Sequence, residues 1–185
     1  MRIDRLFETT ALEAAQALIG ATFRVNGVGG VIVETEAYEL EDPASHSFRG
    51  PTERNRSMFG PGARAYVYRS YGIHWCFNIV CRPGSAVLIR AIEPRWGIVE
   101  MEQRRRGVSL RLLCAGPGRV CQALAIAGEH DGLAVEEPPF DLVLPEEEPT
   151  VVAGKRIGIT KAADLPWRFG LKGSLFVSRR FPRDV

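Results

Sequence analysis

The sequence has few of the residues from which metal sites and disulfide frameworks are built. Among its 185 residues are four cysteines and three histidines, with no C-x-x-C pair and no zinc-finger spacing between the two types. The cysteines are Cys76, Cys81, Cys114 and Cys121, and the histidines are His46, His74 and His130. We therefore expect buried free thiols, no metal site and no structural disulfide.

Long hydrophobic runs are also missing. The start of the chain has no apolar stretch of the kind that forms a signal peptide, and no later stretch approaches the length of a membrane span. Neither glycine-rich phosphate-binding pattern, G-x-x-x-x-G-K-[ST] or G-x-G-x-x-G, occurs. We expect a cytoplasmic protein with no membrane association and no bound cofactor.

The composition is that of an ordinary globular domain. Hydrophobic residues make up 45% of the chain and charged residues 25%, and the length suffices to close a core without metal or disulfide support. No repeat occurs, and no linker is clear enough to divide the chain. We expect residues 1–185 to form a single domain.

The net charge of +2 conceals an uneven distribution. Residues 43–119 contain 13 arginines and four glutamates, a net charge of +9, whereas residues 129–148 contain eight acidic residues and no lysine or arginine, a net charge of −8. An arginine-dense half suits a polyanion that docks on one side. A solvated arginine-rich surface explains the charge equally well.

Apolar periodicity and turn residues predict a mixture of helices and strands. Thr10 and Glu13 form a capping-box pattern, which predicts a helix that continues to Ile19 and stops at Gly20. Further helices are predicted over residues 98–106 and 119–127. Strands are predicted over residues 21–25, 30–38, 66–68, 73–80, 86–92, 141–144, 155–159 and 175–178.

Two hairpins and one long loop organise these elements. Asn26-Gly27 joins the first pair of strands, and residues 69–72 join a second pair with Tyr71 near the tip. Residues 39–63 form an irregular stretch, which inside a compact domain is usually functional or disordered. The pattern predicts an α+β fold: one domain with a curved, mainly antiparallel sheet, a protruding β-hairpin and several packed helices.

The segment 34–38 brings two carboxylates beside an aromatic ring. Because alternate residues of a strand share a face, we expect Glu34, Glu36 and Tyr38 to project together. A carboxylate fixed by a sheet beside an aromatic ring suits a general base. Alternatively, both glutamates are exposed residues at a sheet edge, and the segment by itself favours that interpretation.

Three of the four tyrosines, Tyr66, Tyr68 and Tyr71, fall within six positions on one predicted hairpin. Aromatic rings on a core strand usually pack, but a ring at a hairpin tip has little core to enter. With Arg64 and Arg69 nearby, Tyr71 resembles the wedges that minor-groove-binding proteins insert between bases. A contact with a protein partner accounts for an exposed tyrosine equally well.

Two weaker signals lie elsewhere. His46 stands near the start of the arginine-rich loop, where a lone histidine is more often structural than catalytic. Residues 116–118, Gly-Pro-Gly, precede a predicted helix and fit either a phosphate at its N-terminus or a tight turn.

An ordered set of segments carries a resemblance to a known family. The segments are Ile32-Val33-Glu34-Thr35-Glu36-Ala37-Tyr38, Ala44-Ser45-His46-Ser47, Arg54-Asn55-Arg56-Ser57-Met58-Phe59, Tyr66-Val67-Tyr68, Tyr71-Gly72, Cys76-Phe77-Asn78-Ile79, Val87-Leu88-Ile89-Arg90-Ala91-Ile92-Glu93-Pro94, Gly116-Pro117, Cys121-Gln122-Ala123-Leu124-Ala125-Ile126, Arg156-Ile157-Gly158-Ile159 and Arg168-Phe169. In this order they resemble the alkyladenine (3-methyladenine) DNA glycosylase family, in a compact bacterial form. The sequence departs at Ile73-His74, which leaves the groove contacts of the hairpin open, and in the acidic segment 136–148, which lies in a variable part of the family.

The resemblance implies the catalytic and base-binding residues. Glu36 is implied to be the general base that deprotonates a water, and Arg90 and the backbone carbonyl of Ile157 are implied to help hold that water. The residues implied to wall the pocket and stack on the base are Tyr38, His46 and Tyr68. Asn78 is implied to lie at the pocket floor, where its amide would clash with the exocyclic amino group of guanine.

The resemblance also implies how the DNA is held. Tyr71 is implied to fill the gap that the extruded nucleotide leaves. We expect backbone contacts from arginines of the loop and hairpin: Arg49, Arg54, Arg56, Arg64 and Arg69.

The predicted function is that of a monofunctional DNA glycosylase of base excision repair. It flips 3-methyladenine, 7-methylguanine, hypoxanthine or ethenoadenine out of duplex DNA and hydrolyses the N-glycosidic bond, leaving an abasic site. None of the three lysines lies in the matched segments, so we expect no Schiff base. The expected partner is double-stranded DNA with a damaged purine, bound by a monomer at the nucleoid. The alternatives are a non-catalytic binder of damaged or distorted DNA, and an enzyme of free nucleosides or nucleotides.

Overall fold

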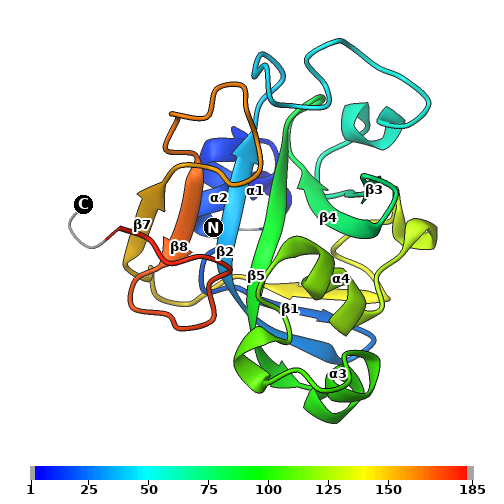
Figure 1. Cartoon of the computed structure of the whole chain (residues 1–185). Helices are drawn as coiled ribbons and strands as arrows, with labels where there is room; N and C mark the ends of the chain where they lie inside the picture. Colours follow the sequence, from blue (N-terminus) through cyan, green and yellow to red (C-terminus); the bar gives the residue numbers. More distant parts are fainter. Residues whose placement is uncertain (1–2, 183–185) are drawn as a thin grey trace.

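The fold is built on one antiparallel sheet, seen in a computed structural model that describes residues 3–182 (Figure 1). The strands are β1 (Thr22–Val25), β2 (Val28–Tyr38), β3 (Ala65–Ser70), β4 (His74–Val80), β5 (Ala86–Trp96), β6 (Phe140–Val143), β7 (Val151–Gly154) and β8 (Arg168–Leu171). The helices are α1 (Ile3–Leu6), α2 (Ala11–Ala17), α3 (Ile98–Arg104) and α4 (Pro117–Leu124), with short 3-10 helices at Arg56–Phe59, Leu110–Leu112 and Gly128–His130. The predicted α+β class is confirmed.

Strand β2 lies inside the sheet and is paired on both sides. β5 runs along one side of it. On the other side, β1 pairs with its first residues and β8 pairs with Glu34, Thr35 and Glu36. The two glutamates therefore occupy the interior of the sheet, and their interpretation as exposed edge residues is wrong.

The predicted helices are present, with shifted ends. The capping box forms as predicted, because the Thr10 hydroxyl accepts the N–H of Glu13 while the Glu13 carboxylate accepts the N–H of Thr10. α2 nevertheless ends before the predicted stop. α4 lies earlier than the predicted 119–127, because Pro117 opens it and Ala125 closes it with a left-handed φ of 56°.

Both predicted hairpins are confirmed. Asn26 and Gly27 have φ angles of 49° and 81°, and Tyr71 and Gly72 have φ angles of 50° and 68°. Two consecutive positive φ angles are typical of the tight turn whose twist matches its strands. The β3–β4 hairpin stands at the opposite side of the sheet from β7 and β8 (Figure 1).

Two predicted strands are wrong. Residues 155–159 and 175–178 lie in loops, and the last strand pair is β7–β8. The apolar residues of these two loops predict strands, but backbone N–H groups in both loops bind buried carboxylates instead of a neighbouring strand. The N–H of Ile157 donates to Glu36, and the N–H of Ser178 donates to Glu34.

The core lies between the sheet and the helices. Phe23 and Phe140 pack against Phe77 with ring centroids 5.0 and 5.4 Å away. α2 packs on β2 and β5, while α4 packs on β4 and β5.

All four cysteines are buried free thiols. Within residues 3–182, no group of three or more histidine, cysteine or acidic side chains is arranged to hold a metal ion. No helix in this part of the chain has the length and apolarity to cross a membrane.

Candidate active site

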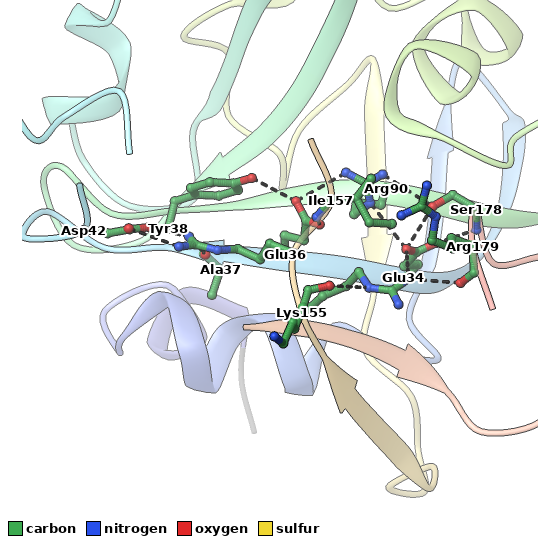
Figure 2. Close-up of polar contacts among 12 residues, drawn as sticks. Glu34, Glu36, Ala37, Tyr38, Asp42, Arg90, Lys155, Ile157, Ser178 and Arg179 are labelled. Carbon is green, nitrogen blue, oxygen red and sulfur yellow. Dashed lines mark hydrogen bonds and ion pairs between the residues drawn. The ribbon is translucent and has the colours of Figure 1, made fainter. Parts of the chain in front are cut away.

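The carboxylate of Glu36 is fully buried and is held from three directions (Figure 2). The N–H of Ile157 donates to Oε1 over 2.8 Å, and the hydroxyl of Tyr38 donates to Oε2 over 2.8 Å. Nη1 of Arg90 lies 3.3 Å from Oε2. Among residues 3–182, only the Ile157 bond reaches Oε1, so this oxygen retains a lone pair for another donor.

The surroundings of Glu36 act on its ionisation in opposite directions. Burial raises the pKa of Glu36, and the charge of Glu34 raises it further, against the lowering effects of Arg90, the Ile157 N–H and the Tyr38 hydroxyl. Burial would lower the pKa of Arg90, but the charges of Glu36 and Glu34 outweigh it and raise that pKa. A carboxyl group with a raised pKa beside a permanent cation is suited to accept a proton near neutral pH.

Glu34, on the same face of β2, is likewise fully buried. Its Oε1 lies 3.3 Å from Nε of Arg90 and 2.8 Å from Nη1 of Arg168, and its carboxylate also accepts the N–H and hydroxyl of Ser178. Figure 2 shows Arg90 between the two carboxylates. The prediction that Glu34 and Glu36 project together is confirmed.

Aromatic side chains from β3 and the loop 39–63 form a wall beside this centre. Nδ1 of His46 lies 2.9 Å from the hydroxyl of Tyr66, and the His46 ring meets Tyr68 edge-on with centroids 4.4 Å apart. Tyr66 and Tyr68 stack at 5.4 Å. Partial desolvation lowers the pKa of His46, and burial raises the pKa of Tyr68, so both rings are uncharged near neutral pH. An uncharged aromatic wall is suited to a planar ligand.

The wall borders a cleft of about 1290 Å³. The predicted catalytic and base-binding residues that line it are Tyr38, His46, Tyr68, Asn78, Arg90 and Ile157. Asn78 is buried, and its amide donates to the Tyr66 carbonyl over 3.0 Å. Glu36 lies behind Tyr38, Arg90 and Ile157 and does not itself line the cleft. The structure thus brings the predicted residues together, with the carboxylate one contact below the cleft surface.

The hairpin tip projects beside the cleft. Tyr71 is 88% exposed, and Ile73 is 76% exposed. Tyr71 and Gly72 both line the cleft. A role for Tyr71 in core packing is therefore excluded.

The five predicted backbone-binding arginines are all exposed, but they do not form one group. Arg49, Arg54 and Arg69 line the cleft, whereas Arg56 and Arg64 lie outside it. Lys161 also lines the cleft, although no lysine occurs in the segments that carried the family resemblance.

Arg156 is a site residue whose role was not predicted. Its side chain is fully buried, pairs with Asp42, and donates to the Ala37 carbonyl over 2.9 Å. Its guanidinium carbon lies 4.7 Å from the ring centroid of Tyr38. Because Arg156 also directly precedes Ile157, it fixes both Tyr38 and Ile157, two of the hydrogen-bond partners of Glu36. No local pattern identifies this role, since Asp42 is 114 positions away.

Arg105 was also missed. It lies at the end of α3, is 9% exposed, and its Nε and Nη1 have no hydrogen-bond partner within residues 3–182. Burial lowers its pKa, and the charge of Arg119 in the first turn of α4 lowers it further. A buried cation with unsatisfied donors beside a helix N-terminus is suited to an anion, and adds to the phosphate signal of residues 116–118.

The sequence is similar to known proteins over most of its length. A model of the family described as "Methylpurine-DNA glycosylase (MPG)" matches residues 5–175. A protein of Rhizobium meliloti (strain 1021) named "Putative 3-methyladenine DNA glycosylase" is 65% identical over 175 residues, which cover 95% of each chain. A protein of the same name from Agrobacterium fabrum is 61% identical over 178 residues, 96% of this chain and 92% of the relative.

Proposed function

The chain belongs to the methylpurine-DNA glycosylase family, and we propose that it uses Glu36 as the general base that hydrolyses the bond between a damaged purine and its sugar. Family membership makes it a DNA repair hydrolase of N-glycosyl bonds that acts on methylated purines such as 3-methyladenine. The observation that carries the residue-level proposal is the buried Glu36 carboxylate, held by Arg90, Ile157 and Tyr38 directly beneath an aromatic cleft.

The proposed reaction is a displacement by water. A water that enters between Arg90 and Ile157 gives one proton to the free lone pair of Glu36 Oε1. Its other O–H donates a hydrogen bond to the carbonyl of Ile157 and remains on the oxygen that bonds to the sugar. The water oxygen bonds to C1′ of the sugar while the C1′–N bond breaks and its electron pair leaves with the purine. The transition state resembles an oxocarbenium ion, which the negative charge of Glu36 stabilises.

The cleft wall supplies the slot for the extruded base. Tyr38 and Tyr68, with His46 edge-on, would stack on the purine. A cationic base such as 3-methyladenine gains about 1–2 kcal/mol from the desolvated aromatic faces. We propose that the same slot accepts 7-methylguanine, hypoxanthine and ethenoadenine, and that Asn78 rejects normal guanine.

The hairpin and the arginines would hold the distorted duplex. Extrusion of a nucleotide costs a few kcal/mol of stacking and pairing, which Tyr71 offsets by filling the vacated position. Phosphates on either side would lie against the exposed arginines Arg49, Arg54, Arg56, Arg64 and Arg69. A further phosphate would meet Arg105 and the start of α4.

We further propose that residues 1–185 act as a single glycosylase domain, as a monomer at the nucleoid in the cytoplasm. The chemistry needs no Schiff base, although Lys161 lines the cleft. Borohydride treatment during turnover should therefore trap no covalent complex. A trapped adduct that disappears in Lys161→Ala would show that the lysine attacks C1′ instead of water.

The decisive experiment compares wild type with Glu36→Gln. DNA methylated with dimethyl sulfate and synthetic duplexes with one hypoxanthine or ethenoadenine are incubated with excess enzyme, and released bases and abasic sites are counted. Loss of the general base in Glu36→Gln should slow the release of the damaged purine by about 100-fold or more, with duplex affinity retained. Glu93→Gln, which changes a partly exposed carboxylate on β5, serves as the matched control.

The alternatives predict different outcomes. A non-catalytic binder of damaged DNA would release no base in either form. An enzyme of nucleosides would act faster on free inosine than on the duplex.

A further inference from the structure

The second buried carboxylate has no step in the proposed reaction, yet it has more donors than Glu36. Glu34 accepts hydrogen bonds from Arg90, from Arg168, and from both the N–H and the hydroxyl of Ser178. Within β2 it lies two positions before Glu36 and, like Glu36, has no exposed surface. So many donors around a carboxylate that does not reach the cleft indicate a role in fixing other groups.

Arg90 is the group that Glu34 fixes. Its Nε contacts Glu34 at 3.3 Å, its Nη1 contacts Glu36 at 3.3 Å, and its Nη2 contacts the Ser178 hydroxyl at 3.4 Å. Since a guanidinium is planar, three fixed contacts on different nitrogens determine its orientation. Without Glu34, the same guanidinium is free to turn both of its outer nitrogens onto Glu36.

The C-terminal segment completes this arrangement. Ser178 donates to Glu34, and the ring of Phe181 lies 3.8 Å from the guanidinium carbon of Arg168, which is also bound to Glu34. Phe181 is in close contact with β8, since a Cβ at Gly170 would meet its ring at 2.3 Å. Ser178 and Phe181 lie beyond residues 5–175, the part that the family model matches.

We propose that Glu34 and Ser178 are positioning residues for base release: they hold Arg90 so that its Nη1 faces Glu36 and its remaining surface faces the cleft. The inference rests on the proposed function, in which Glu36 and Arg90 act on the attacking water. Two carboxylates and two guanidiniums also leave this buried cluster neutral, so Arg90 serves both glutamates without excess charge.

The test is a double-mutant cycle on the single-turnover rate of base release from methylated DNA. The variants are Glu34→Gln, Arg90→Lys and the combination of both. Misplacement of Arg90 should make Glu34→Gln slower than wild type by about 10- to 100-fold, without loss of duplex affinity. In the Arg90→Lys background the same change should cost about twofold or less, because the group that it positions is already altered.

Ser178 provides a milder variant, which should fold because its side chain is only half-buried. Ser178→Ala removes the hydroxyl that joins Glu34 to Arg90 and should slow release by about two- to tenfold. Ser178→Thr retains the hydroxyl and should restore the rate. Ser174→Ala is the matched control in the same segment, since the Ser174 hydroxyl contacts only the Phe176 N–H among the described hydrogen bonds.

The outcomes separate this inference from the proposed function. A wild type that releases no base overturns both. If wild type is active and Glu36→Gln is not, two results overturn the inference alone. One is a Glu34→Gln variant that releases the base at the wild-type rate. The other is an equal loss of rate from Glu34→Gln in the wild-type and Arg90→Lys backgrounds. Should Glu34→Gln not fold, as judged by circular dichroism, the cycle of Ser178→Ala with Arg90→Lys decides in the same way.

Discussion

Replacement of Tyr38 by phenylalanine tests the ionisation of Glu36 without changing the shape of the cleft. The ring remains to stack on a base and on the Arg156 guanidinium, whose carbon lies 4.7 Å from the ring centroid. Only the hydroxyl that donates to Glu36 Oε2 over 2.8 Å is lost. Since this bond lowers the pKa of Glu36 and burial already raises it, the change should raise that pKa further.

The size of the effect follows from the bond. A hydrogen bond to a charged group stabilises by about 1.5–3 kcal/mol, which is roughly 10- to 150-fold in the equilibrium between ionised and protonated Glu36. The base must be ionised to accept a proton, so the rate rises with pH as Glu36 ionises. At acidic pH, Tyr38→Phe should be slower than wild type by about this factor, and the two rates should converge on the alkaline plateau.

The assay is the single-turnover release of 3-methyladenine from methylated DNA across pH 5 to 9, corrected for spontaneous loss. Tyr66→Phe is the matched control, because the Tyr66 hydroxyl contacts His46 and makes no contact with Glu36. For Tyr66→Phe, the rise of the rate with pH on the acidic side should coincide with that of wild type. Superimposed profiles for Tyr38→Phe and wild type, or an equal loss at every pH, would refute the reasoning.

Three further predictions test the wedge, the buried ion pair and the anion site. Tyr71→Ala should lower kcat/KM on lesion duplexes by roughly tenfold or more without changing Tm, because the ring is 88% exposed and, in the proposed function, stacks on DNA; a large drop in Tm would show that it packs in the protein. Asp42→Asn should lower the free energy of unfolding in urea by about 3–5 kcal/mol, because the Asp42–Arg156 pair is fully buried. Asp141→Asn, in a partly exposed pair, should cost about 1 kcal/mol or less, and similar losses for both would contradict the assignment. Arg105→Met should reduce the slope of log affinity against log salt by about 0.9, and an unchanged slope would mean that Arg105 meets no phosphate.

Local signals in the sequence predict the parts of the fold that depend on neighbours in the chain. The capping box of α2, the Asn26-Gly27 turn and the β3–β4 hairpin each depend on a few adjacent residues, so their residue types suffice. The strand period likewise placed Glu34 and Glu36 on one face.

Burial of these glutamates and the β7–β8 pair could not be read in the same way. β8 pairs with the second half of β2, and nothing in a run of local residues records that pairing. The loop 155–159 has the apolar residues of a strand, while its backbone N–H at Ile157 is committed to Glu36. Without the partner across the sheet, such segments are indistinguishable from strands.

The family resemblance identified the side chains around the cleft, whose functional roles remain predictions. It assigned no role to Arg156, which lies in a matched segment, and did not include Arg105, because the importance of each arginine lies in what surrounds it. Arg156 matters through a buried pair formed across 114 positions, and Arg105 through donors that nothing in the described chain satisfies.

Several residues that donate to the two carboxylates of β2 lie far from them along the chain. This separation affects how the protein acquires its activity. Besides Tyr38 and Arg90, Glu34 and Glu36 have donors that stand 121, 134 and 144 positions later, at Ile157, Arg168 and Ser178. Burying an unpaired carboxylate is strongly unfavourable, so the middle of β2 stays hydrated during synthesis until the end of the chain arrives. We therefore expect competence for repair to come in the last stage of folding, and a chain that ends before residue 178 should be incompletely folded.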